Sequence, residues 1–303
     1  MRILFMGTTD FAAACLDAAV KAGYPVAAVC TKADRPKNRG MKLVASPVKA
    51  YAQKAGLPVL QPTELRSAES QAALRAVGAE LFLVVAYGKL LPKAVLALPR
   101  LGCVNVHASL LPKYRGAAPI QWAVLNGEKE TGVTTMYLAE EMDAGDVLDR
   151  AALPIGQTES FGSVYGRLMT LGAELMVKTL GDIEAGRAAA QPQDPALVTF
   201  APPITKALCP VDWSASPENI LHRVCGLDPK PGATARFGET EYKLFSPALT
   251  ELRTELSPGS VVGSDKKGLL VACGGGEVLR IRELQAPGGK RMAAADYLRG
   301  HAL

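Results

Sequence analysis

LGCVNVHASLLPKYRGAAP, residues Leu101–Pro119, is the stretch around which this 303-residue chain is organised. Its first part, Cys103–Val106, mixes β-branched and polar residues in alternation after a glycine, which predicts a β-strand. Because side chains alternate across a strand, Asn105 and His107 are expected on one face, two residues apart. Pro112 lacks a backbone N–H and ends regular strand pairing soon afterwards.

This amide and imidazole have two interpretations. In an open α/β sheet, ligands bind at the carboxyl ends of the strands, so Asn105 and His107 would be placed for chemistry. Alternatively both are structural, with the histidine hydrogen-bonded in the core and the asparagine bonded to a turn. The residue spacing alone leaves both interpretations open.

The N-terminal part of the chain predicts a parallel sheet. Ile3–Met6 and Val26–Cys30 are apolar strand patterns on either side of a helix that starts near Thr9 and ends near Ala22. This β-α-β order, with the near-continuous apolar run Leu81–Val85, is typical of an α/β fold with a mostly parallel sheet. The turn after the first strand carries only Gly7 and no Gly-x-Gly-x-x-Gly, which disfavours a nicotinamide-dependent dehydrogenase.

Composition narrows the class of protein. The chain is 49% hydrophobic and 21% charged, with a net charge of +5. It has no apolar run of about 18 residues and begins directly with a strand pattern, so neither a membrane span nor a signal peptide is expected. The six cysteines are scattered without a Cys-x-x-Cys pair, which predicts a reduced, cytoplasmic protein without a zinc site.

The connection Thr31–Ser46 is much longer than the usual two to six residues between a strand and a helix. Between Lys32 and Lys49 the sequence is basic, with Asp34 as its acidic residue. Such a run is either a solvated loop or a cationic loop that binds phosphates. Long loops in compact domains are often functional, and the second interpretation is favoured.

The expected domains are residues 1–189, a linker at 190–207 and a smaller domain at 208–303. Prolines crowd the linker, including Pro192, Pro195, Pro202 and Pro203. After it come short strand patterns separated by turn residues, which favour a small β-barrel: Ala233–Phe237, Tyr242–Phe245, Ser260–Val262, Leu269–Cys273 and Val278–Leu284.

The motif from Asn105 to Pro112, followed by Tyr114–Pro119, resembles the signature of the folate-dependent formyltransferases. The resemblance extends from Arg2 into the C-terminal region. It implies a Rossmann-like formyltransferase domain followed by an OB-like β-barrel domain that binds tRNA. The implied reaction uses 10-formyltetrahydrofolate as co-substrate and no metal. The ending Arg115–Pro119 is most similar to members that formylate the methionine carried by initiator tRNA.

The resemblance also implies the site residues. Asn105 and His107 would act with Asp143 of Met142–Gly145 as the catalytic group, while Glu140, Glu141 and Asp146 of the same acidic turn are interpreted as solvated. The amide and a protonated imidazole would donate to the formyl oxygen, and Asp143 would favour the imidazolium. The residues expected to line the folate pocket are Tyr87, Gly88, Ser109, Leu110, Leu111 and Pro112, and those expected to touch tRNA are Arg39, Lys42 and Lys206.

Two other functions stay open on the sequence. The chain could formylate an amino-sugar nucleotide, which would leave the long basic loop without a purpose. It could also be a non-catalytic RNA-binding protein, which would leave Asn105, His107 and Asp143 unexplained. A monomer is expected, and the sequence leaves open whether His107, Asp143 or a water carries the proton.

Overall fold

The computed structural model describes residues 1–37, 42–301 and 303. Contacts between residues divide the chain into two compact units, each built from segments far apart in sequence. The first unit comprises Met1–Gly116, Gly132–Ala152 and Arg167–Phe200, and the second comprises Ala117–Thr131, Leu153–Gly166 and Ala201–Leu303.

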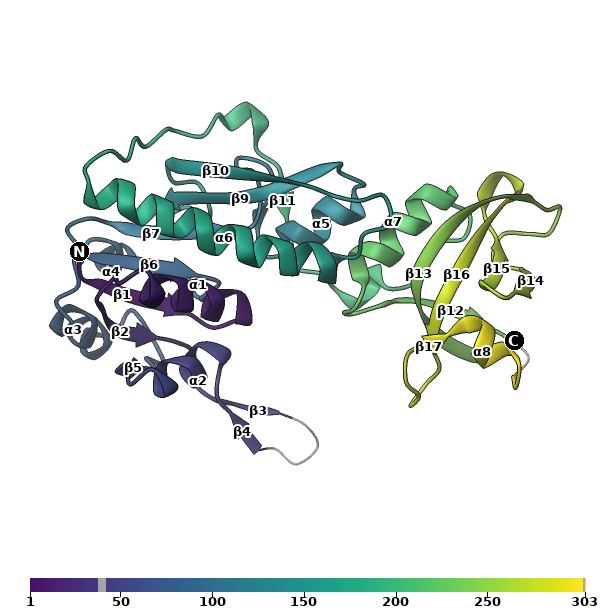
Figure 1. Cartoon of the computed structure of the whole chain (residues 1–303), viewed down its shortest axis with the longest axis horizontal. Coiled ribbons are helices and arrows are strands. Elements are labelled where there is room, and N and C mark those ends of the chain that lie inside the picture. The colour runs from purple at the N-terminus through teal and green to yellow at the C-terminus, as the bar shows by residue number, and fades with distance from the viewer. Residues whose placement is uncertain (38–41, 302) are drawn as a thin grey trace. The chain divides into compact units, whose positions relative to one another are not determined.

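A seven-stranded sheet forms the centre of the first unit, with strand order β10-β9-β7-β6-β1-β2-β5 (Figure 1). The strands from β7 to β5 pair in parallel, and β9 runs antiparallel to β7. Their bounds are β1 Ile3–Gly7, β2 Val26–Cys30, β5 Val59–Leu60, β6 Leu81–Val85, β7 Cys103–His107, β9 Glu130–Tyr137 and β10 Val147–Pro154. The predicted α/β fold with a mostly parallel sheet is confirmed.

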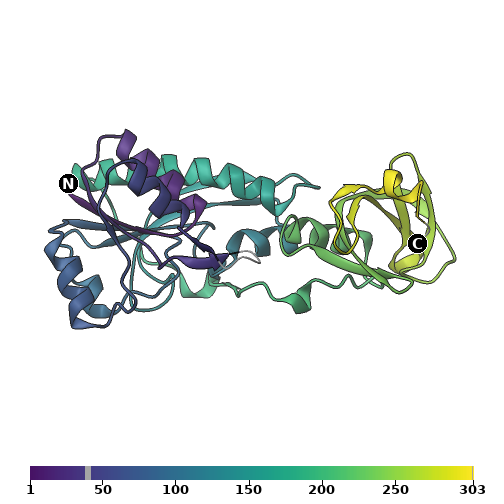
Figure 2. The same ribbon diagram turned by 90° about the horizontal axis from the view of Figure 1, so that it is seen from below.

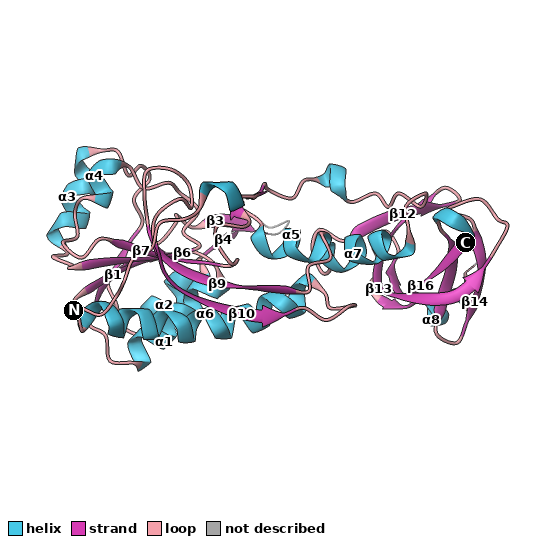
Figure 3. Ribbon diagram, turned by 90° about the horizontal axis from the view of Figure 1, so that it is seen from above, coloured by secondary structure: helices cyan, strands magenta, loops and turns pink. Residues whose placement is uncertain are grey.

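Helices cover both faces of this sheet. Figure 2 and Figure 3 show α1, α2 and α6 on one face and α3 and α4 on the other. Their bounds are α1 Asp10–Lys21, α2 Pro47–Lys54, α3 Ala68–Ala76, α4 Lys93–Leu96 and α6 Phe161–Glu184. Among the described residues, no helix is both long and apolar enough to cross a membrane.

The helix starts follow from local sequence. Thr9 and Ser46 are extended residues whose hydroxyls accept hydrogen bonds from the N–H groups of Ala12 and Lys49, which satisfies donors that a helix leaves unpaired at its start. Pro47 occupies the first turn of α2, where a missing N–H does no harm. The predicted helix start near Thr9 is therefore confirmed.

Strands β1, β6 and β7 are buried along their whole length. A core cluster on one side of the sheet contains Leu4, Met6, Phe82 and Val84. Because both faces of these strands are covered, β6 is apolar at every position, as expected for a central parallel strand.

The long basic connection contains a small hairpin that the sequence analysis missed. Strands β3 (Arg35–Lys37) and β4 (Lys42–Val44) pair in antiparallel fashion (Figure 1). The sequence pattern did not indicate these strands, because charged residues, which are uncommon in strands, are frequent in this connection.

The base of this hairpin is held by side chains. The hydroxyls of Thr31 and Ser46 hydrogen-bond at 2.8 Å and join the two ends of the connection. Lys49 Nζ donates to Asp34 Oδ2 at 2.7 Å and to Gln61 Oε1 at 2.9 Å. Lys49 therefore anchors the hairpin and pairs with the acidic residue of the connection.

The second unit contains an antiparallel sheet with the order β12-β13-β16-β15-β14, and β17 pairs with β16. The sheet is strongly curved in Figure 2, and its closure into an OB-like barrel stays a prediction. Bounds are β12 Ala233–Phe237, β13 Thr240–Arg253, β14 Val261–Asp265, β15 Gly268–Ala272, β16 Glu277–Gln285, β17 Met292–Ala293, α5 Pro119–Leu125, α7 Pro217–Leu227 and α8 Ala294–Leu298.

Strand β13 is the largest departure from the expected barrel strands. The predicted piece Tyr242–Phe245 is only the first part of a 14-residue strand. Ser246 has φ +51° and Pro247 follows it, and both features normally end a strand. The strand continues past them because β16 pairs with it on both sides of the bend.

Residues 190–200, the first part of the expected linker, make backbone hydrogen bonds to the first unit. Gln191 exchanges two backbone hydrogen bonds of 2.8 Å with Val147. Further on, Thr199 O accepts from Arg115 N at 2.9 Å, and β11 (Phe200–Ala201) follows directly. The change from the first unit to the second falls after Phe200.

Candidate active site

Strand β7 delivers Asn105 and His107 to the carboxyl end of the parallel sheet. It lies between β6 and β9 and ends at His107. Asn105 is 9% and His107 6% exposed. The predicted strand is confirmed, and the expected placement at a strand end agrees with the general rule for ligand sites in such sheets.

The hydrogen bonds of His107 define where its protons lie. Nε2 lies 3.0 Å from the carbonyl oxygen of Tyr114, and because a carbonyl only accepts, Nε2–H must donate. Nδ1 lies 3.7 Å from Asp143 Oδ2, which is too long for a hydrogen bond but short for two opposite charges. A second proton, on Nδ1, would therefore face a carboxylate in a nearly buried setting.

Asp143 is held in an uncommon backbone conformation. Its φ is +53°, in the left-handed region that side-chain-bearing residues seldom adopt. The N–H of Gly116 donates to Oδ2 at 2.8 Å, so the same oxygen faces both Gly116 and His107. The sequence expectation that Asp143 stands beside His107 agrees with this geometry.

Asn105 brings a mostly buried amide to the end of β7. Within the described part of the chain, no hydrogen bond involves its side chain, although that side chain is mostly buried. A buried amide normally hydrogen-bonds, because an unsatisfied polar group is costly. An open, nearly buried donor at the end of β7 is therefore suited to bind an oxygen atom of a ligand.

Cysteine nucleophiles do not belong to this site. All six cysteines are buried. Cys103, on the same strand as Asn105, has its pKa raised to about 12 by burial, which keeps the thiol protonated and unreactive.

The residues Ser109 to Pro112 form the turn after β7. Ser109 and Leu111 are buried, whereas Leu110 and Pro112 are partly exposed. Ser109 Oγ donates to Lys113 O at 2.6 Å, so this side chain holds the turn. Of the four residues of this turn, Leu110 and Pro112 have side-chain surface that a ligand could contact.

Buried Thr134 of β9 secures the same turn. Its hydroxyl donates to Ser109 O at 2.7 Å and accepts from Leu111 N at 3.1 Å. The turn is thus tied to the sheet from both of its ends. Sequence reasoning did not identify this role, because it depends on the pairing of β7 with β9.

Tyr87 and Gly88, the other residues expected to line the folate pocket, differ in exposure. The Tyr87 ring lies in the hydrophobic core, and its hydroxyl is 3.5 Å from Cys30 Sγ. Its carbonyl oxygen accepts from Thr8 Oγ1 at 3.0 Å, which joins the loops after β1 and β6. Gly88 is exposed with φ +73°. Tyr87 therefore anchors the loop from within the core, and Gly88 is the exposed member of the pair.

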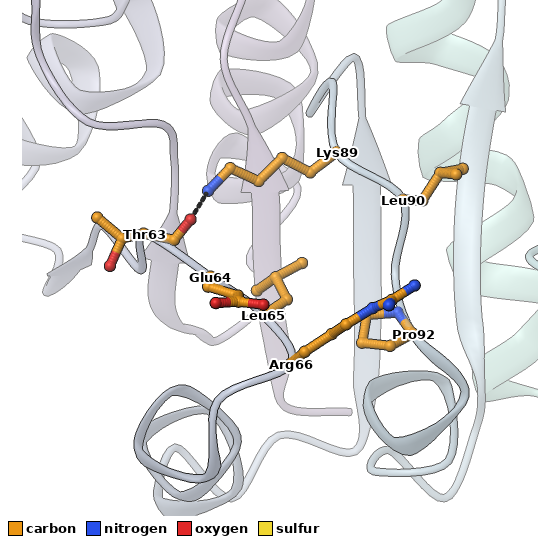
Figure 4. Close-up of a pocket in the computed structure, with 7 residues that line it drawn as sticks. All are labelled: Thr63, Glu64, Leu65, Arg66, Lys89, Leu90 and Pro92. Carbon is orange, nitrogen blue, oxygen red and sulfur yellow. Dashed lines mark hydrogen bonds between the residues drawn. The ribbon is translucent and has the colours of Figure 1, made fainter.

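A shallow pocket lies at the far end of the same loop. Its volume is ≈ 200 Å³, and Figure 4 shows its lining residues: Thr63, Glu64, Leu65, Arg66, Lys89, Leu90 and Pro92. Lys89 Nζ donates to Thr63 O at 2.7 Å and to Pro62 O at 2.9 Å. These bonds fix the loop after β6 to the segment that precedes α3.

The residues expected to touch tRNA are separate from this group. Lys206 is exposed and belongs to the second unit. Lys42 begins β4. Arg39 lies outside the described residues.

Two further residues bear on the site and were missed. Arg115 is 7% exposed, and its Nε and Nη2 donate to Gln193 Oε1 at 3.1 and 2.9 Å. Arg115 is a basic residue within the motif Leu101–Pro119, and this could have marked it as a candidate. Gln193 lies in the proline-rich segment, where no sequence feature marks it as part of a site.

Metal ligands of the usual kind do not cluster here. Among the described residues, no group of three or more His, Cys, Asp or Glu side chains could hold a metal ion.

Comparisons with known proteins identify the family. A formyl transferase domain model matches residues 1–180, and a formyl transferase C-terminal domain model matches residues 203–302. The chain is 46% identical over 304 residues to a methionyl-tRNA formyltransferase of Moorella thermoacetica, covering 100% of this chain and 97% of that protein. It is 44% identical over 301 residues to the enzyme of the same name from Geobacter metallireducens, covering 99% and 96%.

Solved structures share the fold at lower identity. HypX from Aquifex aeolicus in complex with tetrahydrofolic acid matches with a TM-score of 0.68 at 19% identity, over 98% of this chain and 47% of that chain. WlaRD, a sugar 3N-formyl transferase, matches with a TM-score of 0.69 at 15% identity, over 93% and 97%. With both domain models and near-full-length relatives in agreement, the chain belongs to the formyltransferase family, among the methionyl-tRNA formyltransferases.

Proposed function

We propose that this protein transfers the formyl group of 10-formyltetrahydrofolate to the α-amine of methionine esterified to initiator tRNA. One observation carries the proposal: the identity of 44–46% to methionyl-tRNA formyltransferases extends over both units of the chain. The folate supplies the formyl group, bound to N10. In the reaction a bond forms between the amine nitrogen and the formyl carbon, the bond to N10 breaks, and a proton passes from the amine to N10.

Asn105 is the donor to the formyl oxygen. Negative charge develops on that oxygen as the amine attacks, and a fixed donor in a mostly dry site stabilises it strongly. The side chain of Asn105 suits this role because it is nearly buried and has no partner among the described residues. The neighbouring His107 has already committed Nε2–H to Tyr114 O, which leaves Nδ1 as its reactive side.

His107 and Asp143 form the charged part of the site. A second proton on His107 Nδ1 would face the Asp143 carboxylate, 3.7 Å away, in the charged form of the pair that we assign to the reaction. In that form the positive imidazolium stabilises the developing oxyanion. The proton that leaves the attacking ammonium and the proton that N10 gains pass through this pair or a water that it holds.

The folate is assigned to the carboxyl ends of β6 and β7. There the loop after β6 presents exposed Gly88, and the turn after β7 presents partly exposed Leu110 and Pro112. An apolar wall with few polar groups is the usual character of a small-molecule site. Tyr87, Ser109 and Leu111 support that wall from the core.

The tRNA is held by basic residues outside the reacting group. Lys206 of the second unit is exposed. We assign Arg39 and Lys42 of the basic connection to the same partner. Backbone phosphates supply most of the affinity in nucleic-acid binding, so cations of this kind are suited to the partner. We further propose that the protein acts as a monomer in the cytoplasm, and light scattering of the purified protein tests the oligomeric state.

The decisive experiment measures formyl transfer with two acceptors. The purified protein is incubated with 10-formyltetrahydrofolate and either methionyl initiator tRNA or a dTDP-amino sugar, and the formylated product is identified by mass spectrometry. We expect product from the methionyl-tRNA. Transfer to the sugar nucleotide alone would reverse the assignment, and binding of tRNA without transfer to either acceptor would leave a non-catalytic RNA-binding protein.

A further inference from the structure

Gln193 lies in the proline-rich segment and contacts the site through its whole side-chain amide. Nε2 donates to Asp143 O at 2.8 Å and to Gly145 O at 2.8 Å. Oε1 accepts from Arg115 Nε at 3.1 Å and from Nη2 at 2.9 Å. A side-chain amide has two donors and two acceptor positions, and Gln193 uses all four.

The Asp143 turn needs support from outside. Asp143 has φ +53°, and a strained backbone of this kind persists only where its surroundings hold it. Within the turn itself, the hydrogen bond from Ala144 N to Glu141 O is long, at 3.5 Å. The two bonds from Gln193 Nε2 to the carbonyls of this turn are much shorter and hold it from the side.

Gln193 also holds the second element that places Asp143. Arg115 directly precedes Gly116, whose N–H donates to Asp143 Oδ2 at 2.8 Å. The guanidinium of Arg115 is nearly buried, and its acidic neighbour Glu141 is exposed and 3.5 Å away. Gln193 therefore supplies the closer partner of a buried cation and ties it to the Asp143 turn.

We propose that Gln193 is a positioning residue for formyl transfer, which sets the Asp143 carboxylate against His107 Nδ1 by joining the Asp143 turn to Arg115. This inference rests on the proposed function, because it assigns Gln193 a part in the same reaction. Through Gln193, the proline-rich segment would take part in the reaction of the first unit.

Gln193→Glu separates the two halves of this contact. The glutamate keeps oxygen acceptors for Arg115 but presents oxygen, in place of an N–H donor, to the carbonyls of Asp143 and Gly145. A displacement of about 1 Å at a reacting group can reduce the rate about 100-fold, so we expect kcat to fall about 10- to 100-fold. KM for both substrates should change little, because Gln193 is not assigned to either binding surface.

Gln191→Glu is the matched control. It makes the same chemical change two residues earlier, where the exposed Gln191 joins β10 through its backbone alone among the described hydrogen bonds. Its kcat should equal that of the wild type. Thermal unfolding of each variant shows whether the fold is retained, and Gln193→Ala, which introduces no new charge, replaces Gln193→Glu if that variant does not fold.

A double-mutant cycle with Asp143→Asn tests the mechanism of the effect. If Gln193 acts through Asp143, its substitution should slow Asp143→Asn much less than it slows the wild type, since residues that act as one unit are strongly non-additive. A general structural role predicts the same fold loss in both backgrounds and would overturn the inference. A wild-type kcat in Gln193→Glu and Gln193→Ala would also overturn it.

The same assay distinguishes this inference from the proposed function. If the wild type forms no formyl-methionyl-tRNA, the proposed function fails. If the wild type is active and Asp143→Asn is slow while the Gln193 variants are normal, only the positioning role fails.

Discussion

Replacing Asp143 by asparagine should slow formyl transfer about 100-fold while leaving the fold unchanged. The substitution keeps the size of the side chain and an oxygen that can accept from Gly116, but it removes the charge 3.7 Å from His107 Nδ1. Two unit charges at this distance attract by about 4 kcal/mol if the effective dielectric constant is about 20. Since about 1.4 kcal/mol corresponds to a tenfold change in rate, this sets an upper limit near 1,000-fold, which desolvation of the carboxylate reduces.

The assay is single-turnover formation of formyl-methionyl-tRNA with both substrates saturating. Asp146→Asn is the control, because it removes an exposed carboxylate from the same acidic turn. We expect the control to retain the wild-type rate. A fast Asp143→Asn beside a slow Asp143→Ala would refute the reasoning, since the carboxylate would then serve only as an acceptor for the Gly116 N–H.

Four further outcomes are expected. Asn105→Ala should lower kcat about 100- to 1,000-fold, and adding His107→Ala should cost less than the product of the single losses, as measured by steady-state kinetics. Gly145→Ala should greatly reduce turnover, because its Cβ would overlap the Tyr137 carbonyl oxygen; a wild-type rate would contradict the close packing of this turn. Arg39→Lys should lose much of the activity that Arg39→Ala loses, with folate binding unchanged, because only arginine holds a phosphate or base edge at two points. Full activity of Arg39→Lys would reduce the basic connection to a diffuse positive patch. The pKa of Glu283 is lowered chiefly by its hydrogen bond to Arg291. Its contribution to stability is therefore present above the unfolded pKa of about 4.3 and is lost as the pH falls through the lower folded value. Glu283→Gln should make the fall of Tm with decreasing pH less steep, and an unchanged slope would contradict this.

Local sequence predicted the features that local physics controls. The turn at Thr9 predicted a helix start because the capping hydrogen bond is made within three residues. Strand β7 was predicted because its side-chain alternation depends only on neighbouring residues. That Asn105 and His107 share one face of the strand followed from this alternation.

The remaining features depend on contacts between distant segments. Tyr87 was expected to line the folate pocket, and its ring lies in the hydrophobic core with its hydroxyl 3.5 Å from Cys30 Sγ, 57 residues away in sequence. Strand β13 extends through Pro247 because β16 pairs with it, and no pattern within β13 indicates that pairing. Composition predicted a linker at residues 190–207, because proline-rich segments usually lack fixed partners. The backbone hydrogen bonds of Gln191 with Val147 and of Thr199 with Arg115 join distant parts of the chain, so no local pattern indicates them.

The site therefore combines two kinds of placement. Asn105 and His107 are fixed by a regular strand inside a buried sheet, so their positions depend on the fold as a whole. Asp143 is fixed by single hydrogen bonds from Gly116, 27 residues away, and from Gln193, 50 residues away. Each such bond can be removed without loss of the core. It follows that substitutions in residues 190–200 can impair the chemistry while the first unit stays folded, whereas substitutions within β7 affect folding and chemistry together.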